Sequence, residues 1–248
     1  MKARLIINKN CSAAFNMAAD EYLLDFEKLP TVRLYTWEKP SISIGRFESI
    51  KDVVDLESCQ KNNISIVRRI TGGGSVFHDQ EITYSITIFE NLFPQLKDLH
   101  QSYQFINQAI INALKNIGLK ADFVPLNDLV VNGKKISGCA QTRRKNKILQ
   151  HGTVLISVDF KKMFSYLKVS QVKISDKKIK DVSQRVTSIS QELKNIIDPE
   201  ILINSLIFGF TENFKFEFVE KNFSKTETKC IKKIIDKRFS NKLWTYER

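Results

Sequence analysis

Three consecutive glycines, Gly72, Gly73 and Gly74, are the feature of this sequence that most restricts the local fold. Glycine lacks Cβ, so the backbone can adopt positive φ angles and approach a ligand closely, with several N–H groups free to face an anion. Arg68 and Arg69 precede the glycines and add forked, charged donors that suit a carboxylate or a phosphate. The segment predicts an anion-binding loop, and the alternative is a glycine-rich turn beside solvated arginines.

The segments that flank the glycines alternate between apolar and polar residues, as strands do. Residues 64–67 lead toward the glycines, and residues 75–78 lead away from them and end at His78. We therefore expect the glycines to form a turn between two strands. Neither common phosphate-binding motif is present, because a P-loop ends in Gly-Lys-Ser/Thr and a dinucleotide fingerprint spaces its glycines through a strand-to-helix turn.

A second segment, residues 127–143, predicts a β-hairpin. An apolar run is followed by an Asn-Gly dipeptide, typical of a two-residue turn, and then by a run of small residues. Lys134 and Lys135 begin the returning strand and point to opposite faces, which places one of them on the ligand side. The next strand, residues 147–157, contains His151. A lone lysine or histidine on a strand is usually an edge charge or a structural group. The site is therefore indicated by the combination of the glycine segment, the lysine hairpin and the histidine strand.

The glycine segment, the hairpin and the histidine strand together resemble the lipoate-protein ligase family. The stretches that carry the resemblance are RRITGGGSVFHD, NDLVVNGKKISGCAQTR and LQHGTVLI, and it extends to residues 16–21, 41–47, 183–187 and 243–244. It implies the α/β (α+β) fold shared by biotin and lipoate ligases and octanoyl or lipoyl transferases, a mixed, largely antiparallel sheet with flanking helices around an acyl-adenylate tunnel. The Gly-Arg-Gly-Arg loop of biotin ligases is absent, which favours lipoate or a related medium-chain acyl group.

The resemblance implies a reaction in two steps. With ATP and Mg²⁺, the lipoate carboxylate is activated as lipoyl-AMP, and the amine of an acceptor lysine then attacks the mixed anhydride. Lys135 matches the family's active-site lysine and is expected to be catalytic. Asn127 and Asp128, together with Lys135, are expected near the nucleotide or its metal ion. The residues expected to bind the acyl substrate or lipoyl-AMP are Arg69, Gly72, Gly73, Gly74, Val76, His78, Lys135, Gly138 and His151.

The remaining histidine and cysteine chemistry is limited. His78 and His151 have no obvious carboxylate partner in the sequence, so we assign them to binding and loop positioning. No histidine or cysteine pair has metal-ligand spacing, and no residue is assigned to a resident metal. The cysteines are scattered and are expected to be reduced thiols: Cys11, Cys59, Cys139 and Cys230.

An acyltransferase that takes octanoyl or lipoyl from an acyl carrier protein through a cysteine thioester is the alternative within the same fold. Such enzymes place the nucleophile in the loop before the Gly-Lys-Lys hairpin or in a Pro-Cys-Gly setting. Residues 121–128 contain no cysteine, and the second pattern is absent. We therefore prefer the ligase, and we interpret Cys139 as a small buried filler in the hairpin.

The formal net charge of +12 suggests an acidic partner. The resemblance implies acidic apo lipoyl domains, namely those of the acyltransferase subunits of 2-oxoacid dehydrogenases and the glycine cleavage H protein. Nucleic acid is the less favoured alternative, because the basic stretches lack interleaved aromatic residues. The chain ends soon after Trp244 without the accessory domain of many family members, so adenylation is expected to involve a separate accessory-domain protein in some cases.

The length of 248 residues fits one catalytic domain, in which residues 189–248 form a packed helical extension. No apolar run is long enough to span a membrane and no secretory signal is evident, so a cytoplasmic location is expected. Pro199 is expected either to break a helix or to begin one. Helices are predicted at residues 13–27, 49–61, 99–117, 159–168, 190–209 and 226–238, and strands at 4–8, 32–37, 41–46, 64–70, 75–79, 82–90, 122–125, 128–132, 135–143 and 147–157.

Overall fold

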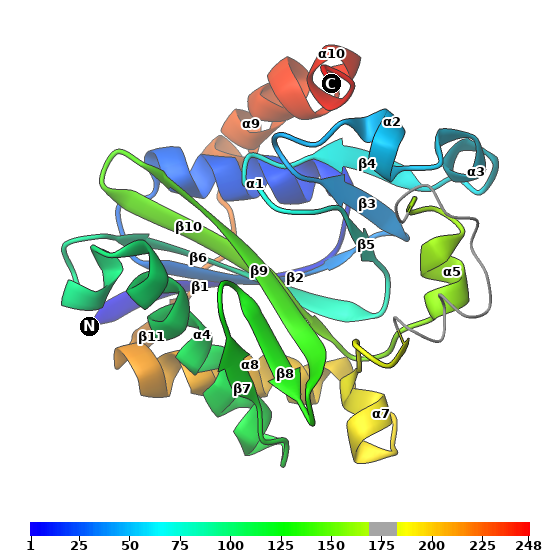
Figure 1. Ribbon diagram of the computed structural model, residues 1–248. Helices are drawn as coiled ribbons and strands as arrows, with labels where there is room; N and C mark the ends of the chain where they lie inside the picture. Colours follow the sequence, from blue (N-terminus) through cyan, green and yellow to red (C-terminus); the bar gives the residue numbers. More distant parts are fainter. Residues whose placement is uncertain (169–182) are drawn as a thin grey trace.

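The computed structural model describes residues 1–168 and 183–248, and its centre is an eight-stranded sheet (Figure 1). The strand order is β11-β1-β2-β6-β10-β9-β8-β7. Neighbouring strands are antiparallel, except that β1 runs parallel to both β2 and β11. The strands are β1 (Lys2–Cys11), β2 (Thr31–Trp37), β6 (Glu81–Phe89), β7 (Asp122–Val124), β8 (Asp128–Val131), β9 (Lys134–Arg144), β10 (Lys147–Leu155) and β11 (Glu217–Glu220). The predicted fold class, a mixed and largely antiparallel sheet with flanking helices, is confirmed.

A second sheet of three strands carries the glycine loop. Its central strand is β3 (Ser41–Ile44), which is parallel to β4 (Ser65–Arg68) and antiparallel to β5 (Val76–His78). The glycines lie between two strands, as expected, but these strands are not neighbours, so the connection is not a hairpin turn. Because the fully buried β3 pairs along both of its edges, the loop that joins β4 to β5 has to cross the end of β3.

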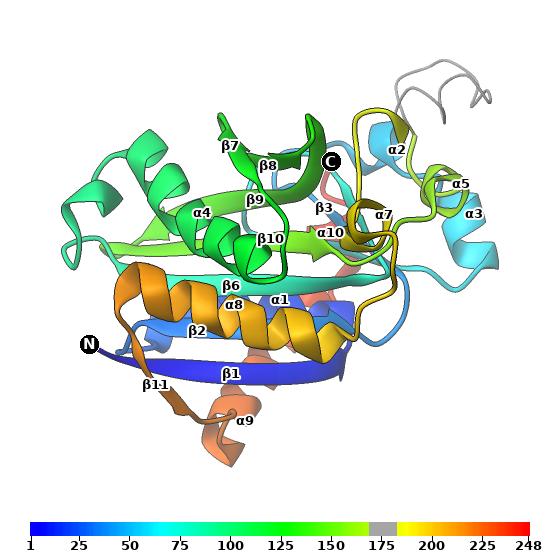
Figure 2. The same cartoon turned by 90° about the horizontal axis from the view of Figure 1, so that it is seen from below.

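Helices cover both faces of the large sheet (Figure 2). The helices α4 (Leu99–Asn116) and α8 (Pro199–Phe214) pack against each other and cover one face, where they form the main hydrophobic core with the strands. The other face is covered by α1 (Ala13–Phe26) and the small sheet. Side chains on this second face are unusually polar for an interior, and they include Arg33, Ser85 and His151. The functional site lies on this side.

The other described helices are short: α2 (Ile50–Val53), α3 (Leu56–Lys61), η1 (Pro94–Leu96), α5 (Phe160–Phe164), α7 (Ile189–Leu193), α9 (Lys225–Ile234), η2 (Ile235–Phe239) and α10 (Lys242–Thr245). The predicted helix 49–61 is divided into α2 and α3 because Val54 is extended and forms a β-bridge with Leu167. Leu167 lies just after the end of α5. The predicted helix 190–209 is also two helices. Asp198 caps the second helix and Pro199 occupies its first turn, which confirms the alternative in which Pro199 begins a helix. The predicted helix 226–238 becomes a π-helical turn after residue 234.

The C-terminal part of the chain is not purely helical. Lys215 adopts a left-handed conformation (φ 54°) at the end of α8, and Glu217–Glu220 then form β11 beside β1. The prediction of helices alone after residue 189 is wrong here, because a four-residue edge strand gives almost no periodic signal. In the described residues, no helix is long and apolar enough to cross a membrane.

Candidate functional site

A cavity of about 430 Å³ lies between the two sheets, with residues of α1 and α5 completing its wall. The predicted site residues that line it are Arg69, Gly73, Gly74, Val76, His78, Asn127, Lys135, Gly138 and His151. Gly72 and Asp128 do not line the cavity themselves, but each contacts a residue that does. The sequence segments that carried the prediction thus meet at one place in the fold.

Arg69 holds the shape of the glycine loop from inside. Its side chain donates from Nη2 to the carbonyl oxygens of Gly72 (2.7 Å) and Gly74 (2.8 Å). Because these carbonyl groups turn inward, the loop is free to present N–H groups on its other side. Arg69 is buried and forms no ion pair with any described carboxylate, and burial lowers its pKa to about 10. The charge of Glu48 partly offsets this lowering of the Arg69 pKa without forming an ion pair, and a buried positive charge with no direct partner favours an anionic ligand in this cavity.

Glycine is required at two points of this arrangement. Gly73 has a φ of +89°, in the left-handed region that the sequence analysis expected for the loop. Gly45, just after β3, packs directly against it, since a Cβ at Gly45 would lie 1.9 Å from the carbonyl oxygen of Gly73. Where the loop crosses the end of β3, the backbones of Gly45 and Gly73 are therefore in direct contact, with no room for a side chain between them.

Arg68 has a structural role that the sequence analysis did not anticipate. Its buried guanidinium donates to the carbonyl oxygens of Glu48 (2.7 Å) and Thr245 (2.9 Å), and it does not line the cavity. Only one arginine of the pair is therefore available to the site. Arg68 instead fastens the C-terminal α10 to β4.

His78 is fixed on three sides. Its Nδ1 lies 2.6 Å from Glu81 Oε1, its Nε2 lies 2.7 Å from Ser43 Oγ, and its ring stacks on Trp37 with centroids 3.8 Å apart. Since an ionised carboxylate can only accept, Nδ1 donates to Glu81, and in the neutral imidazole Nε2 then accepts from the serine hydroxyl. The expectation that His78 lacks a carboxylate partner is wrong, and the spacing of three residues to Glu81 was the signal that sequence reasoning missed.

His151 has an equivalent environment. Its Nδ1 lies 3.0 Å from Asp20 Oδ2 on α1, and its Nε2 lies 2.7 Å from Thr71 Oγ1 in the glycine loop. Burial alone would raise the pKa of Asp20, but the hydrogen bond with His151 and the charge of Arg33 hold it below the usual value. Asp20 is 131 residues from His151 in the sequence, so no local pattern connects the two residues. The one available signal was that Asp20 lies within residues 16–21, which take part in the family resemblance.

Arg69 connects the two histidine networks. Its Nε donates to Thr71 Oγ1 (3.1 Å) and its Nη1 to Ser43 Oγ (3.4 Å), and these hydroxyls are the partners of the histidines. A continuous chain of hydrogen bonds therefore runs from Asp20 across the cavity wall to Glu81. Such a chain fixes the orientation of every member and leaves the loop little freedom to move.

Lys135 reaches the cavity from the opposite wall. Its Nζ lies 2.7 Å from Asp128 Oδ1, and its side chain crosses Gly138, where a Cβ would lie 2.7 Å from both Cε and Nζ of the lysine. Lys135 pairs with Val130 of β8, next to the register shift between β8 and β9. The backbone of Lys135 also bonds to Arg185 (N to O, 2.7 Å) and Thr187 (O to N, 2.8 Å).

Lys134, by contrast, does not line the cavity. The expectation that only one of the two hairpin lysines faces the ligand side is thus met by Lys135. The register shift leaves Ile136, next to Lys135, without a partner on β8.

Cys139 is the one cysteine of the chain that lines the cavity, and its thiol is not accessible. It donates to the backbone carbonyl of Asn127 (3.3 Å) and lies 3.7 Å from Asn107 Oδ1. Burial raises the pKa of the Cys139 thiol to about 12. At neutral pH the nucleophilic thiolate is therefore essentially absent. Among the described residues, no cluster of three or more His, Cys, Asp or Glu side chains could hold a metal ion.

Comparison with known proteins identifies the family. The model of the lipoyl protein ligase A/B catalytic domain matches residues 12–211. The chain belongs to this family. It is therefore an enzyme of the group that comprises lipoate ligases and octanoyltransferases.

Similar sequences of lipoyl protein ligase A/B members come from bacteria. The octanoyltransferase LipM of Clostridioides difficile (strain 630) is 32% identical, with 94% of this chain and 95% of the relative aligned. The octanoyltransferase LipM of Bacillus subtilis (strain 168) is 29% identical, with 99% and 98% aligned.

Similar structures belong to lipoate ligases. A bi-partite lipoate protein ligase from Thermoplasma acidophilum, described with its E2 lipoyl domain, has a TM-score of 0.90 at 29% identity and covers 99% of this chain and 96% of its own. A lipoate-protein ligase A bound with ATP has a TM-score of 0.86 at 26% identity, with 99% of both chains covered. A biotin protein ligase from Aquifex aeolicus, at 15% identity and a TM-score of 0.51, shares the fold.

Proposed function

We propose that this chain is an ATP-dependent lipoate-protein ligase, which activates lipoate as lipoyl-AMP and transfers the lipoyl group to a lysine of an apo lipoyl domain. One observation carries the proposal. The cavity offers a preorganised anion site and an ammonium group on facing walls, while the single cysteine in it is buried and protonated. Such a site suits an acyl group held on a phosphate better than one held on a thiol.

The activation step brings two anions together, so the site must offset their charge. The glycine loop, held by Arg69, would receive the carboxylate or the α-phosphate through its N–H groups. Lys135 would bridge the acyl carbonyl and the α-phosphate from the other wall and stabilise charge on either oxygen. Mg²⁺ carried with the phosphates would lower their charge further, and Asp128, the carboxylate beside Lys135, is the residue that could contact it. Asn127, on the same side of the cavity, would lie near the nucleotide.

The transfer step requires a neutral amine from the acceptor lysine. Both histidine Nε2 atoms are already hydrogen-bonded to hydroxyl groups, so we assign the histidines to holding the loop and leave removal of the amine proton to water or phosphate. The Thermoplasma ligase is described with an E2 lipoyl domain, which supports lipoyl domains of 2-oxoacid dehydrogenases, and by extension the glycine cleavage H protein, as acceptors here. That ligase is also bi-partite, so a separate accessory-domain protein is part of the proposal. We also propose one catalytic domain over residues 1–248, working in the cytoplasm where ATP is available.

Octanoyl transfer from an acyl carrier protein is the second candidate, and the names of the curated relatives favour it. It would require a cysteine that can form a thioester. Cys139 is the available one, and it would have to leave its hydrogen bonds and lose its proton in a buried site. This requirement is why we place the transferase second.

Intact-mass analysis of the chain and an apo lipoyl domain distinguishes the two candidates. The ligase predicts that the acceptor gains the lipoyl mass from lipoate only when ATP and Mg²⁺ are present, and also gains it from synthetic lipoyl-AMP. Synthetic lipoyl-AMP is already activated, so transfer from it needs no accessory protein for adenylation. The transferase predicts acceptor modification from octanoyl carrier protein without ATP, together with an octanoyl mass on this chain.

A further inference from the structure

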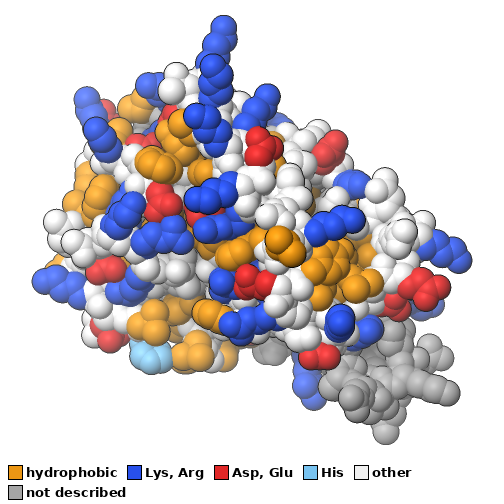
Figure 3. Space-filling model, turned by 90° about the horizontal axis from the view of Figure 1, so that it is seen from above, with side chains coloured by type: hydrophobic (Ala, Val, Ile, Leu, Met, Phe, Trp, Pro, Cys, Tyr) orange, Lys and Arg blue, Asp and Glu red, His pale blue; other side chains and the backbone are white. Residues whose placement is uncertain are grey.

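The end of the molecule that carries α9, η2 and α10 (Figure 1) is rich in Lys and Arg side chains (Figure 3). Among the residues that the structure describes, Glu227 pairs with Arg4 and Glu247 pairs with Arg46, so few acidic groups remain free there. The exposed cations of this end that form no ion pair with a described residue are Lys225, Lys229, Lys232, Lys233, Lys237, Lys242 and Arg248. We call this surface the C-terminal basic face.

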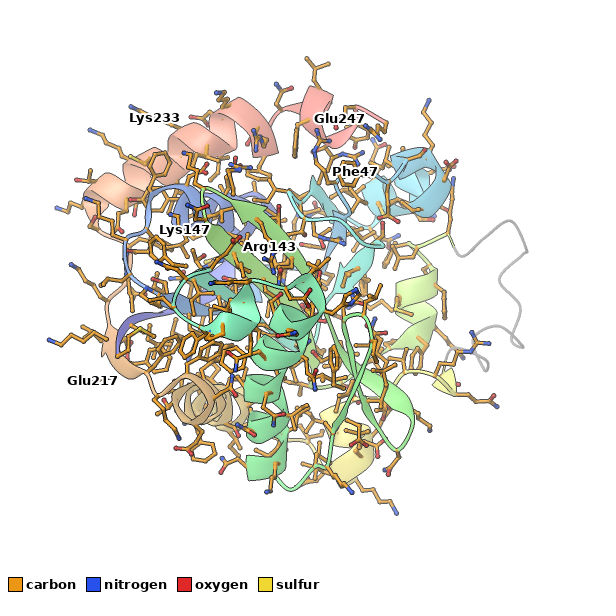
Figure 4. All side chains as sticks on the ribbon, turned by 60° about the vertical axis from the view of Figure 1, so that its left-hand side comes forward. Phe47, Arg143, Lys147, Glu217, Lys233 and Glu247 are labelled. Carbon is orange, nitrogen blue, oxygen red and sulfur yellow. The ribbon has the colours of Figure 1, made fainter. Side chains whose placement is uncertain are left out.

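Large hydrophobic side chains stand exposed among these cations. Phe47 is 69% exposed, Leu243 79% and Tyr246 48%. Phe47 lies beside the C-terminus, with the Arg248 guanidinium 5.8 Å from its ring centroid, and Figure 4 shows it next to Glu247. Exposed aromatic and aliphatic groups within a charged rim are typical of a surface that binds another protein.

The C-terminal basic face is built directly onto the glycine loop. Arg46, which neighbours Phe47, donates its backbone N–H to the carbonyl oxygen of Thr71 (2.9 Å). A Cβ at Gly72 would lie 3.9 Å from the Phe47 ring. The Trp244 indole also donates to the carbonyl oxygen of Arg68 (2.8 Å), at the start of the segment that forms the loop. A partner seated on this face would therefore contact the rim of the cavity.

We propose that the C-terminal basic face docks the acceptor domain, through acidic side chains around an apolar contact with Phe47, Leu243 and Tyr246. The inference rests on the proposed function, since it assigns a docking site to its protein substrate. Charge complementarity identifies the occupant as acidic. A second copy of the chain, with the same face turned toward this one, would place like charges together.

Two variants of the face and two matched controls test the docking. Lys237→Glu/Lys242→Glu reverses two charges, and Lys115→Glu/Lys120→Glu makes the same change at exposed lysines near the end of α4. Leu243→Ser removes the apolar contact, and Ile196→Ser does the same at a residue that is 85% exposed beside α7. All six substituted positions are exposed, so each of the four variants is expected to fold.

Affinity is measured by calorimetry with an acidic apo lipoyl domain whose acceptor lysine is changed to arginine, and KM for the unchanged domain is measured with synthetic lipoyl-AMP as donor. We expect the charge reversal to weaken binding and raise KM by about tenfold, and Leu243→Ser by about fivefold, with kcat little changed and both controls within about twofold. Equal effects of the face variants and their controls would overturn the proposal.

Two further arms test other occupants. The parent chain is titrated with a single-stranded oligonucleotide and with vesicles that contain phosphatidylserine. Binding of either that is lost in Lys237→Glu/Lys242→Glu, with acceptor affinity unchanged, would also overturn the docking proposal. The calorimetric binding does not depend on acyl chemistry, so loss of binding in the face variants supports the docking even if ATP-dependent activation fails.

Discussion

Lys135 reaches the cavity because its neighbours leave a path for its side chain. Gly138 presents no Cβ where the lysine passes, and Asp128 holds the ammonium at 2.7 Å. Opposite, Arg69 turns the carbonyl groups of the glycine loop inward. Lys135 is therefore assigned to charge stabilisation and Arg69 to loop geometry, and single variants test each role alone.

Lys135→Ala should abolish acyl transfer while leaving the free energy of unfolding nearly unchanged, because its ammonium is partly exposed and its ion pair contributes little to stability. Lys134→Ala, outside the cavity, should keep most of the activity. Transfer rates with synthetic lipoyl-AMP and urea unfolding curves measure the two quantities. A larger loss of rate in Lys134→Ala would show that the wrong lysine has been assigned.

Arg69→Lys should weaken lipoate or lipoyl-AMP binding by at least about tenfold, since a lysine keeps the charge but cannot bond the carbonyl groups of Gly72 and Gly74 together. Loss of these part-buried hydrogen bonds should also lower the free energy of unfolding, by about 0.5–1.5 kcal/mol for each bond lost. Arg144→Lys, at a half-exposed arginine, is the control. Unchanged ligand affinity in Arg69→Lys would mean that charge alone defines the site.

At the scale of elements, the helices behind the large sheet meet more closely than ordinary side chains would allow. Gly209 of α8 lies against α4, and a Cβ there would be 2.1 Å from the carbonyl oxygen of Ala109. The pair α4 and α8 supports the strands that present the cavity residues on their other face. The spacing of these helices is therefore set by one residue.

Gly209→Ala should destabilise the protein by about 1–3 kcal/mol, because the helices must move apart to admit one methyl group. Phe208→Ala, at the exposed neighbouring position, should change the free energy of unfolding far less. Denaturant unfolding followed by far-UV circular dichroism compares them. Equal stability of Gly209→Ala and the parent would contradict the described helix contact.

The sequence predicted the elements that consist of consecutive, strongly patterned residues. The glycine loop, the lysine hairpin and the His151 strand each carry their signal within a short stretch, and all three reach the cavity. The partners of the histidines depend on tertiary structure, since Asp20 approaches from a helix far away in the chain. The insertion of β3 between β4 and β5, and the edge strand β11, arise from pairing that local periodicity does not encode.

At the scale of the whole molecule, the two ends of the chain are held together by a buried charge cluster. Arg4 of β1 pairs with Glu27 (2.7 Å) and with Glu227 of α9 (2.6 Å). Burial alone would raise the pKa of Glu227, but hydrogen bonds from Arg4 and Ser224 lower it to about 2. The C-terminal segment, and with it the face beside the glycine loop, thus depends on an ionised carboxylate.

Because the pKa of Glu227 is lower in the folded chain than in the unfolded chain, its contribution is fully present above about pH 4.5 and is lost as the pH falls toward 2. Glu227→Gln keeps a residue that can form the capping box of α9, so it isolates the charge. The parent should be the more stable protein at pH 7, and the difference in free energy of unfolding should shrink as the pH falls toward 2. A difference that stays constant over this range would rule out the ion pair as its source.

The ligase and the transferase differ in the group that carries the activated acyl chain, and Cys139→Ser distinguishes the two enzymes. A ligase holds the acyl group on AMP, so the variant should modify the apo lipoyl domain in the presence of ATP, Mg²⁺ and lipoate, or from synthetic lipoyl-AMP, within about tenfold of the parent rate. A thioester enzyme would lose turnover almost completely. In that case the parent, mixed with octanoyl carrier protein, would gain one octanoyl group on Cys139 that hydroxylamine removes, and this result would contradict the account.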